Sequence, residues 1–375
     1  MIERDSCFFC TSPFQFFSIL ALATEQQEIA DLYIDPQFSG AALFAERIKE
    51  KNIFHNVEVI NSSKIYNKYM RSKPGIKNHL QIAKTYLHVE EITKMILLPG
   101  IKYKNIYLSS KAYFPRIIQL YYIKKKWDFN LYYFDDGAGS YYNDRAYQIK
   151  KTDKLVRWLL FGKKSIDTGH KRFVFAPDIY KLLNPNKSNE IKRIQRFWEE
   201  EAGRRIINYI FNVSDKILIK EKLIILDQPK DEILNTADIE SINNIYRLLV
   251  EKIGFGNAII KKHPRSPEKE IEQVNYFPEN GIPFEIYCMN MNMNKKIIIG
   301  YSSTAVATPK ILFNQEPMVI VLTKLFRPKT GELNLFEDYF LAVKNAYSNP
   351  KRFCIPGSWE ELNNIMNELH IVKVG

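Results

Sequence analysis

Short apolar segments alternate with longer amphipathic segments along most of the chain, and this order restricts the fold more than any other feature. The apolar runs predict buried strands, and the amphipathic stretches between them predict helices. Alternation of this kind gives a parallel sheet covered by helices on both faces. In the first half we expect strands at residues 7–10, 32–34, 57–60, 105–109, 130–134 and 173–176, and helices at 13–24, 41–51 and 113–124.

The pattern pauses after Pro177 and then starts again, which predicts two domains. Residues 189–209 are highly charged and helical in pattern around Trp198, so we expect a connecting helix there. We therefore predict an α/β protein of two Rossmann-like domains, residues 1–210 and 211–375, facing across a cleft, with ligands beyond the carboxyl ends of the strands. The second series of strands is expected at residues 223–226, 258–260, 296–299 and 318–321, with a helix at 239–252.

The chain carries 54 lysines and arginines against 42 aspartates and glutamates, a formal net charge of +12. Such a surplus indicates an acidic partner, which can be a nucleic acid, an anionic membrane surface or an anionic substrate. The lysines are dispersed, and no RNP-like, helix-turn-helix or zinc-finger pattern is present, which argues against a nucleic acid. No apolar run approaches the roughly 20 residues of a membrane-spanning helix. The N-terminus also lacks the basic region of a signal peptide, so we expect a cytoplasmic protein, either free or peripheral on the inner face of the cytoplasmic membrane.

The cysteines do not indicate a disulfide scaffold or a metal site. Cys7 and Cys10 have C-x-x-C spacing, but the two residues between them are both phenylalanine and the segment is a predicted buried strand. No second C-x-x-C or histidine pair completes a zinc site. We interpret the two residues as core thiols and expect no bound metal.

Polar residues directly follow predicted strands at three places, which is where ligands bind in sheets of this class. The first place is Asp135-Asp136-Gly137. A carboxylate at a strand end, beside open glycine backbone, can accept a proton from an attacking hydroxyl. Because Asp-Gly is also a common turn pair, the segment taken alone indicates a turn more strongly than a site.

The second place is His263, which lies between Lys262 and Pro264 after a predicted strand. Histidine can donate a hydrogen bond to a phosphate or protonate a leaving group. Lys261, Lys262 and Arg265 add positive charge for an anion. A solvated basic loop explains the same residues equally well.

The third place is Ser302-Ser303-Thr304, at the predicted start of a helix. Hydroxyl groups and unpaired backbone N–H groups at such a start suit a phosphate. Ordinary N-capping by serine or threonine accounts for the same residues and, taken alone, is the stronger interpretation.

The order and spacing of these motifs are more specific than any one of them, and they resemble those of bacterial sialyltransferases. Asp-Asp-Gly comes in the first half, His-Pro in the second, and Ser-Ser follows. The segment Thr11-Ser12-Pro13-Phe14-Gln15 is similar to the Thr-Pro-x-Gln start of glycosyltransferase family 52, the lipooligosaccharide sialyltransferases, with Ser12 inserted. The resemblance runs from about residue 7 to 305 and rests on four short motifs.

This resemblance implies a GT-B fold and an inverting, metal-independent transfer of sialic acid from CMP-sialic acid. The acceptor would be a galactose-type hydroxyl of a bacterial surface glycan, either lipooligosaccharide or capsule. The first domain would form the acceptor side and the second would bind the nucleotide-sugar donor, with no cofactor.

The resemblance also assigns roles to residues. Asp136 would be the catalytic base, and Asp135 would orient it or take its place. Asp227, at another strand end, is a further alternative base. His263 would stabilise or protonate the leaving phosphate. The remaining substrate-binding residues would be Ser302 and Ser303, on the same phosphate, with Thr11, Gln15, Gly137, Pro264, Arg265 and Thr304.

Other interpretations stay open. A GT-B transferase that uses a UDP- or GDP-sugar has the same fold, and competition by CMP or by UDP separates the two. A catalytically inactive sugar binder and a nucleic-acid binder are more distant alternatives. Residues 124–127 and 157–161 mix cations with aromatic side chains and could touch anionic lipid headgroups, although a solvated charge run and a core helix explain them as well. The sequence is also compatible with a homodimer.

Overall fold

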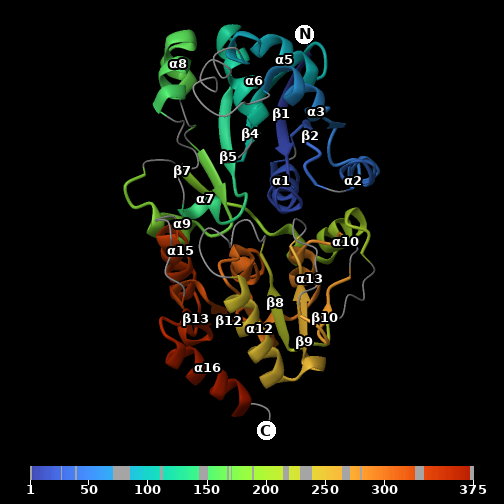
Figure 1. Ribbon diagram of the computed structural model, residues 1–375. Helices are drawn as coiled ribbons and strands as arrows, with labels where there is room; N and C mark the ends of the chain where they lie inside the picture. The colour runs from blue at the N-terminus through green and yellow to red at the C-terminus, as the bar shows by residue number, and fades with distance from the viewer. Residues whose placement is uncertain are drawn as a thin grey trace. The chain divides into compact units, whose positions relative to one another are not determined.

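The chain divides into two compact units, Met1–Asn212 and Val213–Gly375 (Figure 1). The structure is a computed structural model. The residues that it describes are 2–26, 28–38, 40–70, 85–109, 113–142, 151–166, 169, 171–187, 190–213, 219–228, 239–263, 271–278, 281–325 and 333–371.

In the described part of the first unit, seven parallel strands form one sheet in the order β3-β2-β1-β4-β5-β6-β7. All six strands predicted for this half are present, and residues 130–134 form a strand with the predicted ends. The strands are β1 (Ile2–Cys10), β2 (Ala30–Ile34), β3 (Asn56–Val59), β4 (Ile101–Leu108), β5 (Asn130–Phe134), β6 (Lys171–Val174) and β7 (Glu190–Arg193).

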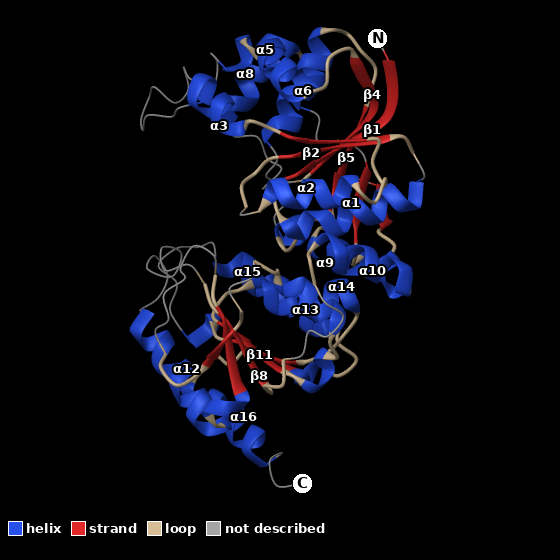
Figure 2. Cartoon of the chain, turned by 90° about the vertical axis from the view of Figure 1, so that its right-hand side faces the viewer, coloured by secondary structure: helices blue, strands red, loops and turns tan. Residues whose placement is uncertain are grey.

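Helices cover both faces of this sheet. Figure 2 shows α5, α6 and α8 over one face and α1 and α2 over the other. The described helices are α1 (Pro13–Gln26), α2 (Ala41–Lys49), α3 (Ser62–Ile65), α5 (Val89–Ile96), α6 (Tyr113–Lys124), α7 (Gly139–Tyr142), α8 (Lys151–Phe161), α9 (Pro177–Leu183) and α10 (Glu201–Ile210), with the short turns η1 (Tyr66–Met70), η3 (Lys163–Ile166) and η4 (Phe197–Glu199).

Helix α1 is fixed by packing on nearly every side. It begins at Pro13, whose restricted backbone suits the first turn of a helix. Phe16, Phe17 and Leu20 are fully buried, and the Phe17 ring meets Trp198 edge-on with centroids 5.2 Å apart. This packing holds the start of α1 at the carboxyl end of β1.

The predicted connecting helix at residues 189–209 is wrong in its first part. Glu190–Arg193 forms β7 at the edge of the sheet, paired with β6, and only residues from Glu201 onward form the helix α10. An edge strand has a neighbouring strand on one side only, and charged side chains are favourable on its open side. Glu190 pairs with Lys171 on the neighbouring strand at 3.7 Å and with Lys192 at 3.0 Å. The charged residues that suggested an exposed helix therefore belong, in this first part, to an edge strand.

In the described part of the second unit, six parallel strands form a sheet in the order β10-β9-β8-β11-β12-β13. The four predicted strands are present, whereas the two-residue strands at either edge were not predicted. The strands are β8 (Leu223–Leu226), β9 (Ala258–Lys261), β10 (Asn275–Tyr276), β11 (Ile297–Gly300), β12 (Met318–Val321) and β13 (Phe353–Cys354).

In this unit α12 and α16 lie together on one face of the sheet, and their apolar side chains join those of β8, β9 and β11 in one core. The predicted α/β class, with two Rossmann-like parallel sheets, is confirmed. The described helices are α12 (Ile239–Ile253), α13 (Phe284–Asn290), α14 (Thr308–Phe313), α15 (Leu333–Asn345) and α16 (Trp359–Ile371), with the turns η5 (Phe255–Asn257), η6 (Met293–Lys295), η7 (Thr304–Ala307), η8 (Thr323–Leu325) and η9 (Pro350–Arg352).

Candidate functional site

Each sheet reverses its strand order once, and ligands of such sheets bind at the carboxyl edge beside that point. In the first unit the reversal lies between β1 and β4, and in the second between β8 and β11. The predicted site residues that the structure describes all lie at these two edges, in the loops after β1, β5, β8, β9 and β11 or in the first turn of the helix that follows.

Gln15 connects the ends of β1 and β4 in the first unit. Its side-chain carbonyl accepts hydrogen bonds from the Thr11 backbone N–H at 2.7 Å and from the Thr11 hydroxyl at 3.1 Å. Its amide donates to the Ser109 hydroxyl at 2.9 Å. The structure therefore brings the predicted residues Thr11 and Gln15 together, and it directs the buried Gln15 side chain at the protein itself.

Asp135 is fully buried and anchored by donors from three sides. One carboxylate oxygen accepts from the Gly137 backbone N–H at 2.9 Å, and the other accepts from the Phe175 backbone N–H at 3.2 Å and from the Tyr141 hydroxyl. Ser18 of α1 donates to the Asp135 backbone carbonyl at 2.6 Å. Asp135 thus fixes the loop after β5 to the end of β6 and to α1.

The environment of Asp135 moves its titration towards neutral pH. Burial raises the pKa of this carboxyl from 3.8 to about 7, and the charge of Asp136 adds to the rise. The hydrogen bonds from Tyr141, Gly137 and Phe175 act in the opposite direction, because they favour the ionised form.

Asp136 differs from its neighbour because it is partly exposed at the edge of the sheet. Its carboxylate accepts from the Ser140 hydroxyl at 2.6 Å, and that same hydroxyl accepts from the Asp136 backbone N–H at 2.9 Å. Gly137 follows with φ of +105°, a conformation that other residues rarely adopt, so the turn requires glycine. The geometry suits an aspartate whose position is fixed and whose side chain meets solvent.

A third carboxylate at this edge was not predicted. Asp35 follows β2, is buried, and carries an oxygen, Oδ1, that has no hydrogen-bond partner. Burial raises the pKa of this carboxyl, and hydrogen bonds from Ser62 and Gln37 limit the rise. The signal was present in the sequence, because Asp35 directly follows the predicted strand at residues 32–34, as the other candidates follow theirs.

In the second unit the three central strands end in register. Leu226 of β8 pairs with Lys261 of β9 and with Gly300 of β11. The residues after these positions are therefore neighbours at the edge. They are Asp227 and Gln228, Lys262 and His263, and Tyr301, Ser302 and Ser303.

Gln228 spans the point where the second sheet reverses its order. Its side-chain carbonyl accepts from the Ser302 backbone N–H at 2.7 Å and from the Ser302 hydroxyl at 3.0 Å. Ser302 is therefore already engaged with the protein, and Gln228 is a site residue that was not singled out from the sequence. A glutamine thus ties two strand ends together in each unit, Gln15 in the first and Gln228 in the second.

Ser303 has a different setting from Ser302. It is the N-cap residue of η7, is only partly buried, and its hydroxyl makes no capping hydrogen bond. Thr304 is the first residue of η7. A Cβ on Gly300 would lie 3.2 Å from the Ser303 Cβ and 3.0 Å from the Val306 side chain, so the turn packs closely over the end of β11.

The basic cluster predicted around His263 is only partly present. Lys262 forms an ion pair with Asp227, and both side chains are largely shielded. Lys261, by contrast, donates to the Ile282 carbonyl at 3.0 Å and lies over the Phe277 ring, and burial lowers the pKa of its amine. The expectation that Lys261 adds charge for an anion is wrong, because the side chain at the last position of β9 packs into the protein.

His263 is partly exposed and follows Lys262 at the end of β9. Pro264 and Arg265, the other residues of the predicted His-Pro motif, lie outside the described residues. The alternative base Asp227 is held in an ion pair by Lys262.

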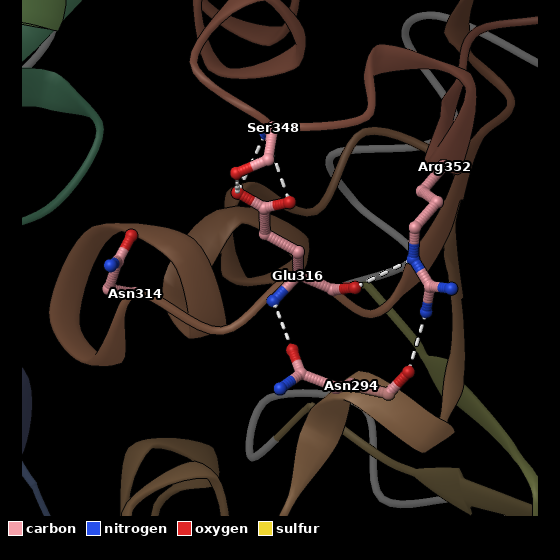
Figure 3. A pocket seen from close by; sticks show the side chains of 5 residues that line it. All are labelled: Asn294, Asn314, Glu316, Ser348 and Arg352. Carbon is pink, nitrogen blue, oxygen red and sulfur yellow. Dashed lines mark hydrogen bonds between the residues drawn. The ribbon is translucent and has the colours of Figure 1, made fainter.

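A hollow elsewhere in the second unit lies at the opposite edge of the sheet (Figure 3). Asn294, Asn314, Glu316, Ser348 and Arg352 line it. Asn294 and Glu316 precede β11 and β12, so the hollow is at the amino ends of these strands, where ligands of this sheet class do not bind. Arg352 donates to the Glu316 carbonyl at 2.9 Å, and the Ser348 backbone donates to both Glu316 carboxylate oxygens. We interpret it as a structural network.

Among the described residues, no three side chains of His, Cys, Asp or Glu gather in a way that could hold a metal ion. Among the same residues, no helix has the length and apolar character needed to cross a bilayer.

Residues 6–322 match the family model described as Alpha-2,8-polysialyltransferase (POLYST). The match includes both carboxyl edges and every candidate residue named above. No curated protein matches the chain.

One solved structure of low sequence identity shares the fold, and a second aligns over a similar length. A putative UDP-N-acetylglucosamine 2-epimerase from Listeria monocytogenes aligns over 100% of this chain and 98% of its own, with 11% identity and a TM-score of 0.50. A UDP-GlcNAc 2-epimerase from Methanocaldococcus jannaschii aligns over 98% and 100%, with 13% identity and a TM-score of 0.48. At such identity the first likeness concerns the fold alone, which is GT-B-like.

Proposed function

The chain belongs to the alpha-2,8-polysialyltransferase family and is a sialyltransferase, and on this premise we propose that it transfers sialic acid from CMP-sialic acid to the 8-hydroxyl of a terminal sialic acid. The observation that carries the proposal is the extent of the family match, which spans both units and all the candidate residues. The motif resemblance to family 52 agrees on the donor, but it suggested a galactose-type acceptor.

We assign the donor phosphate to the carboxyl edge of the second unit. The Ser303 hydroxyl, at the start of η7, is a donor that no capping bond occupies. His263 lies at the end of β9, two strands away from the end of β11 in the order of the sheet. Donors held in place before the reaction stabilise the negative charge that develops as CMP leaves. Gln228 and Ser302 shape this turn, since their polar groups bond to each other.

We assign the base to Asp136 in the first unit. The acceptor hydroxyl oxygen bonds to the anomeric carbon of the donor, and the bond from that carbon to the phosphate oxygen breaks with its electron pair leaving on CMP. The hydroxyl proton passes to the Asp136 carboxylate. Asp135, buried beside it and bonded to Gly137, holds the loop in position. Asp135 and Asp227 are the alternative bases.

The distribution of charge favours the first unit as the side that binds a polyanionic acceptor. Residues 1–212 contain 34 Lys and Arg against 22 Asp and Glu, a net of +12, whereas residues 213–375 contain 20 of each. The whole basic surplus therefore belongs to the first unit. A polymer with one carboxylate per sugar is attracted by such a surface.

The test is CMP release from CMP-sialic acid in the presence of EDTA, with an oligosialic acid or a galactoside as acceptor. We expect release that depends on the oligosialic acid and persists in EDTA. His263→Ala should lower kcat by about 10²- to 10³-fold, as the loss of an electrostatic donor does. Asp136→Asn should lower it by about 10²- to 10⁴-fold, as the loss of a general base does.

Matched controls are His55→Ala and Asp128→Asn, since both residues are exposed and lie just before strands, β3 and β5, at the amino edge of the first sheet. Both controls should keep full activity. If release requires the galactoside instead, the protein is still a sialyltransferase, but polysialic acid is not its acceptor. Turnover of a UDP- or GDP-sugar without any release from CMP-sialic acid would overturn the proposed donor.

A further inference from the structure

Helix α8 exposes a continuous group of large apolar side chains. Leu155 is 57% exposed, Trp158 50%, Leu159 67% and Leu160 46%. They occupy successive turns of one helix of eleven residues, in the first unit (Figure 1). Single exposed apolar residues are ordinary on a protein surface, but four within six positions of one helix form a patch that needs an explanation.

The other face of α8 is fixed to the protein. Arg157 is 1% exposed, donates to the Arg116 carbonyl of α6 at 3.5 Å and lies over the Tyr86 ring at 5.6 Å. Asp153, one turn earlier, accepts from the Tyr86 hydroxyl. Val156 and Phe161 pack against the core of the unit. Because these contacts set the rotation of the helix, the apolar group cannot turn inward without breaking them.

The surroundings of this apolar group are basic. Lys154 on α8 and Lys163 and Lys164 on the following turn η3 are exposed. The one acidic residue between positions 151 and 166 is Asp153, which is partly buried and bonded to Tyr86. The η3 turn is held against α6 by a hydrogen bond from Gln119 to the Lys164 carbonyl at 3.4 Å. The lysines therefore border the apolar group on a fixed frame.

We propose that α8 and η3 form a docking surface for an anionic lipid bilayer, with the helix lying in the interface. An apolar face of leucine and tryptophan bordered by lysine is the composition of interfacial helices. A second protein is a poorer occupant. Four half-exposed side chains present on the order of 400 Å² of apolar surface, about half of the roughly 800 Å² per partner that a stable interface buries.

The test is co-sedimentation of the full chain with vesicles, either phosphatidylglycerol mixed with phosphatidylethanolamine or phosphatidylcholine alone. We expect binding to the anionic vesicles that weakens with salt. The double variant Trp158→Ser, Leu159→Glu should lower the partition coefficient at least about tenfold. The matched control is Leu248→Glu on α12, which adds the same charge at a position 54% exposed and should bind as the wild type does.

Three results would overturn the proposal. They are equal binding by the wild type and the double variant, equal binding to neutral and anionic vesicles, and self-association of the wild type that the double variant abolishes. The last result would assign α8 to a second copy of the chain. All are independent of catalysis, so they do not depend on the donor or the acceptor.

A fluorescence measurement avoids any question of whether the double variant folds. Trp158 and Trp359 are the half-exposed tryptophans, whereas Trp198 is buried and Trp127 packs against the core. In a Trp359→Phe background, lipids brominated near the headgroup should quench Trp158 when anionic vesicles are added. Vesicle binding without quenching would place the contact elsewhere on the chain and remove α8 from it.

Discussion

Ser302 and Ser303 are adjacent and chemically identical, yet the structure gives them different surroundings. Gln228 accepts from both the backbone N–H and the hydroxyl of Ser302. The Ser303 hydroxyl, at the start of η7, makes no capping bond. The sequence motif treats the two serines as one phosphate-binding pair, and the structure separates a serine that holds the turn from a partly buried serine whose hydroxyl makes no capping bond.

This difference predicts a split between activity and stability. Ser303→Ala should lower kcat/KM for CMP-sialic acid by about 10- to 100-fold, the loss of one hydrogen bond to a charged group. Ser302→Ala should lower the free energy of unfolding by about 1 kcal/mol, with less than about a fivefold loss of kcat/KM. Steady-state kinetics and urea unfolding of both variants check it. A larger loss of activity in Ser302→Ala than in Ser303→Ala would contradict it.

Asp135 predicts a pH dependence of stability. In the folded chain its pKa is raised to about 7, whereas the unfolded value is near 3.8. Between these values the folded state keeps a proton that the unfolded state has released, so this carboxyl contributes stability at low pH that is lost as the pH rises towards 7. The slope attributable to it is at most about 1.4 kcal/mol per pH unit.

The measurement is the free energy of unfolding of the wild type minus that of Asp135→Asn, followed from pH 4.5 to 8. This difference should decrease with rising pH and become constant above about pH 7. Asp178→Asn, whose side chain is 88% exposed, serves as the control and should give a difference that does not change in the same way. A difference for Asp135→Asn that stays constant from pH 4.5 to 8 would show that the buried carboxyl is ionised throughout this range.

At the scale of elements, Glu316 joins several pieces of the second unit. Its carboxylate accepts from Lys310 of α14 at 2.6 Å and from the Ser348 backbone, which follows α15. Burial raises the pKa of this carboxyl, but the bonds from Lys310 and Ser348 outweigh that effect and hold the pKa below its usual value. Its contribution to stability is therefore present at neutral pH and is lost as the pH falls through the lowered pKa.

Glu316→Gln should accordingly lower the free energy of unfolding at pH 7 by about 1–2 kcal/mol, since the bonds to a charged acceptor are weakened. The deficit should shrink as the pH falls through the lowered pKa, where the wild-type carboxyl itself becomes protonated. Urea unfolding at pH 7 and at a series of lower pH values checks this. Because the network lies at the amino edge of the sheet, kcat should stay within about twofold of the wild type; a larger loss would bring the hollow of Figure 3 into the site.

The elements that were predicted are those whose apolar pattern matches their burial. Residues 113–124, 130–134, 223–226 and 318–321 form a helix and three strands with the predicted ends. The missed strands are those whose stability comes from a neighbour, and the helices α5, α13, α15 and α16 were not predicted either. Strand β7 is mostly charged and needs β6 beside it, and β10 and β13 have two residues each, too few for any periodicity to appear.

The candidate site was predictable to the extent that a polar residue follows a strand. That rule located Asp135, Asp136, His263 and Ser302, and it would also have located Asp35. It could not separate residues that hold the site from residues that face outward. The bond between Gln228 and Ser302 joins positions 74 apart in the sequence, and the orientation of Lys261 depends on the Phe277 ring. Such contacts exist only once the sheet is assembled.

At the scale of the whole molecule, the uneven charge is the most consequential feature. The first unit has a net charge of +12 and the second has none. In the second unit, Lys262 at the carboxyl edge is already paired with Asp227. Donor binding there should rely on directed hydrogen bonds, whereas a long anionic acceptor should respond to the summed field of the first unit.

Salt should therefore separate the two substrates. Raising NaCl from 50 to 500 mM shortens the screening length from about 14 to 4 Å, so the KM for a soluble oligosialic acid should rise at least about tenfold while the KM for CMP-sialic acid changes by less than about threefold. Both constants come from CMP release without vesicles, so the lysines of α8 and η3 have no lipid to bind. A potassium glutamate series separates screening from chloride binding. Equal salt dependence of the two constants would mean that the charge of the first unit does not act on the acceptor. The anionic bilayer proposed for α8 would then be the partner that accounts for the basic surplus.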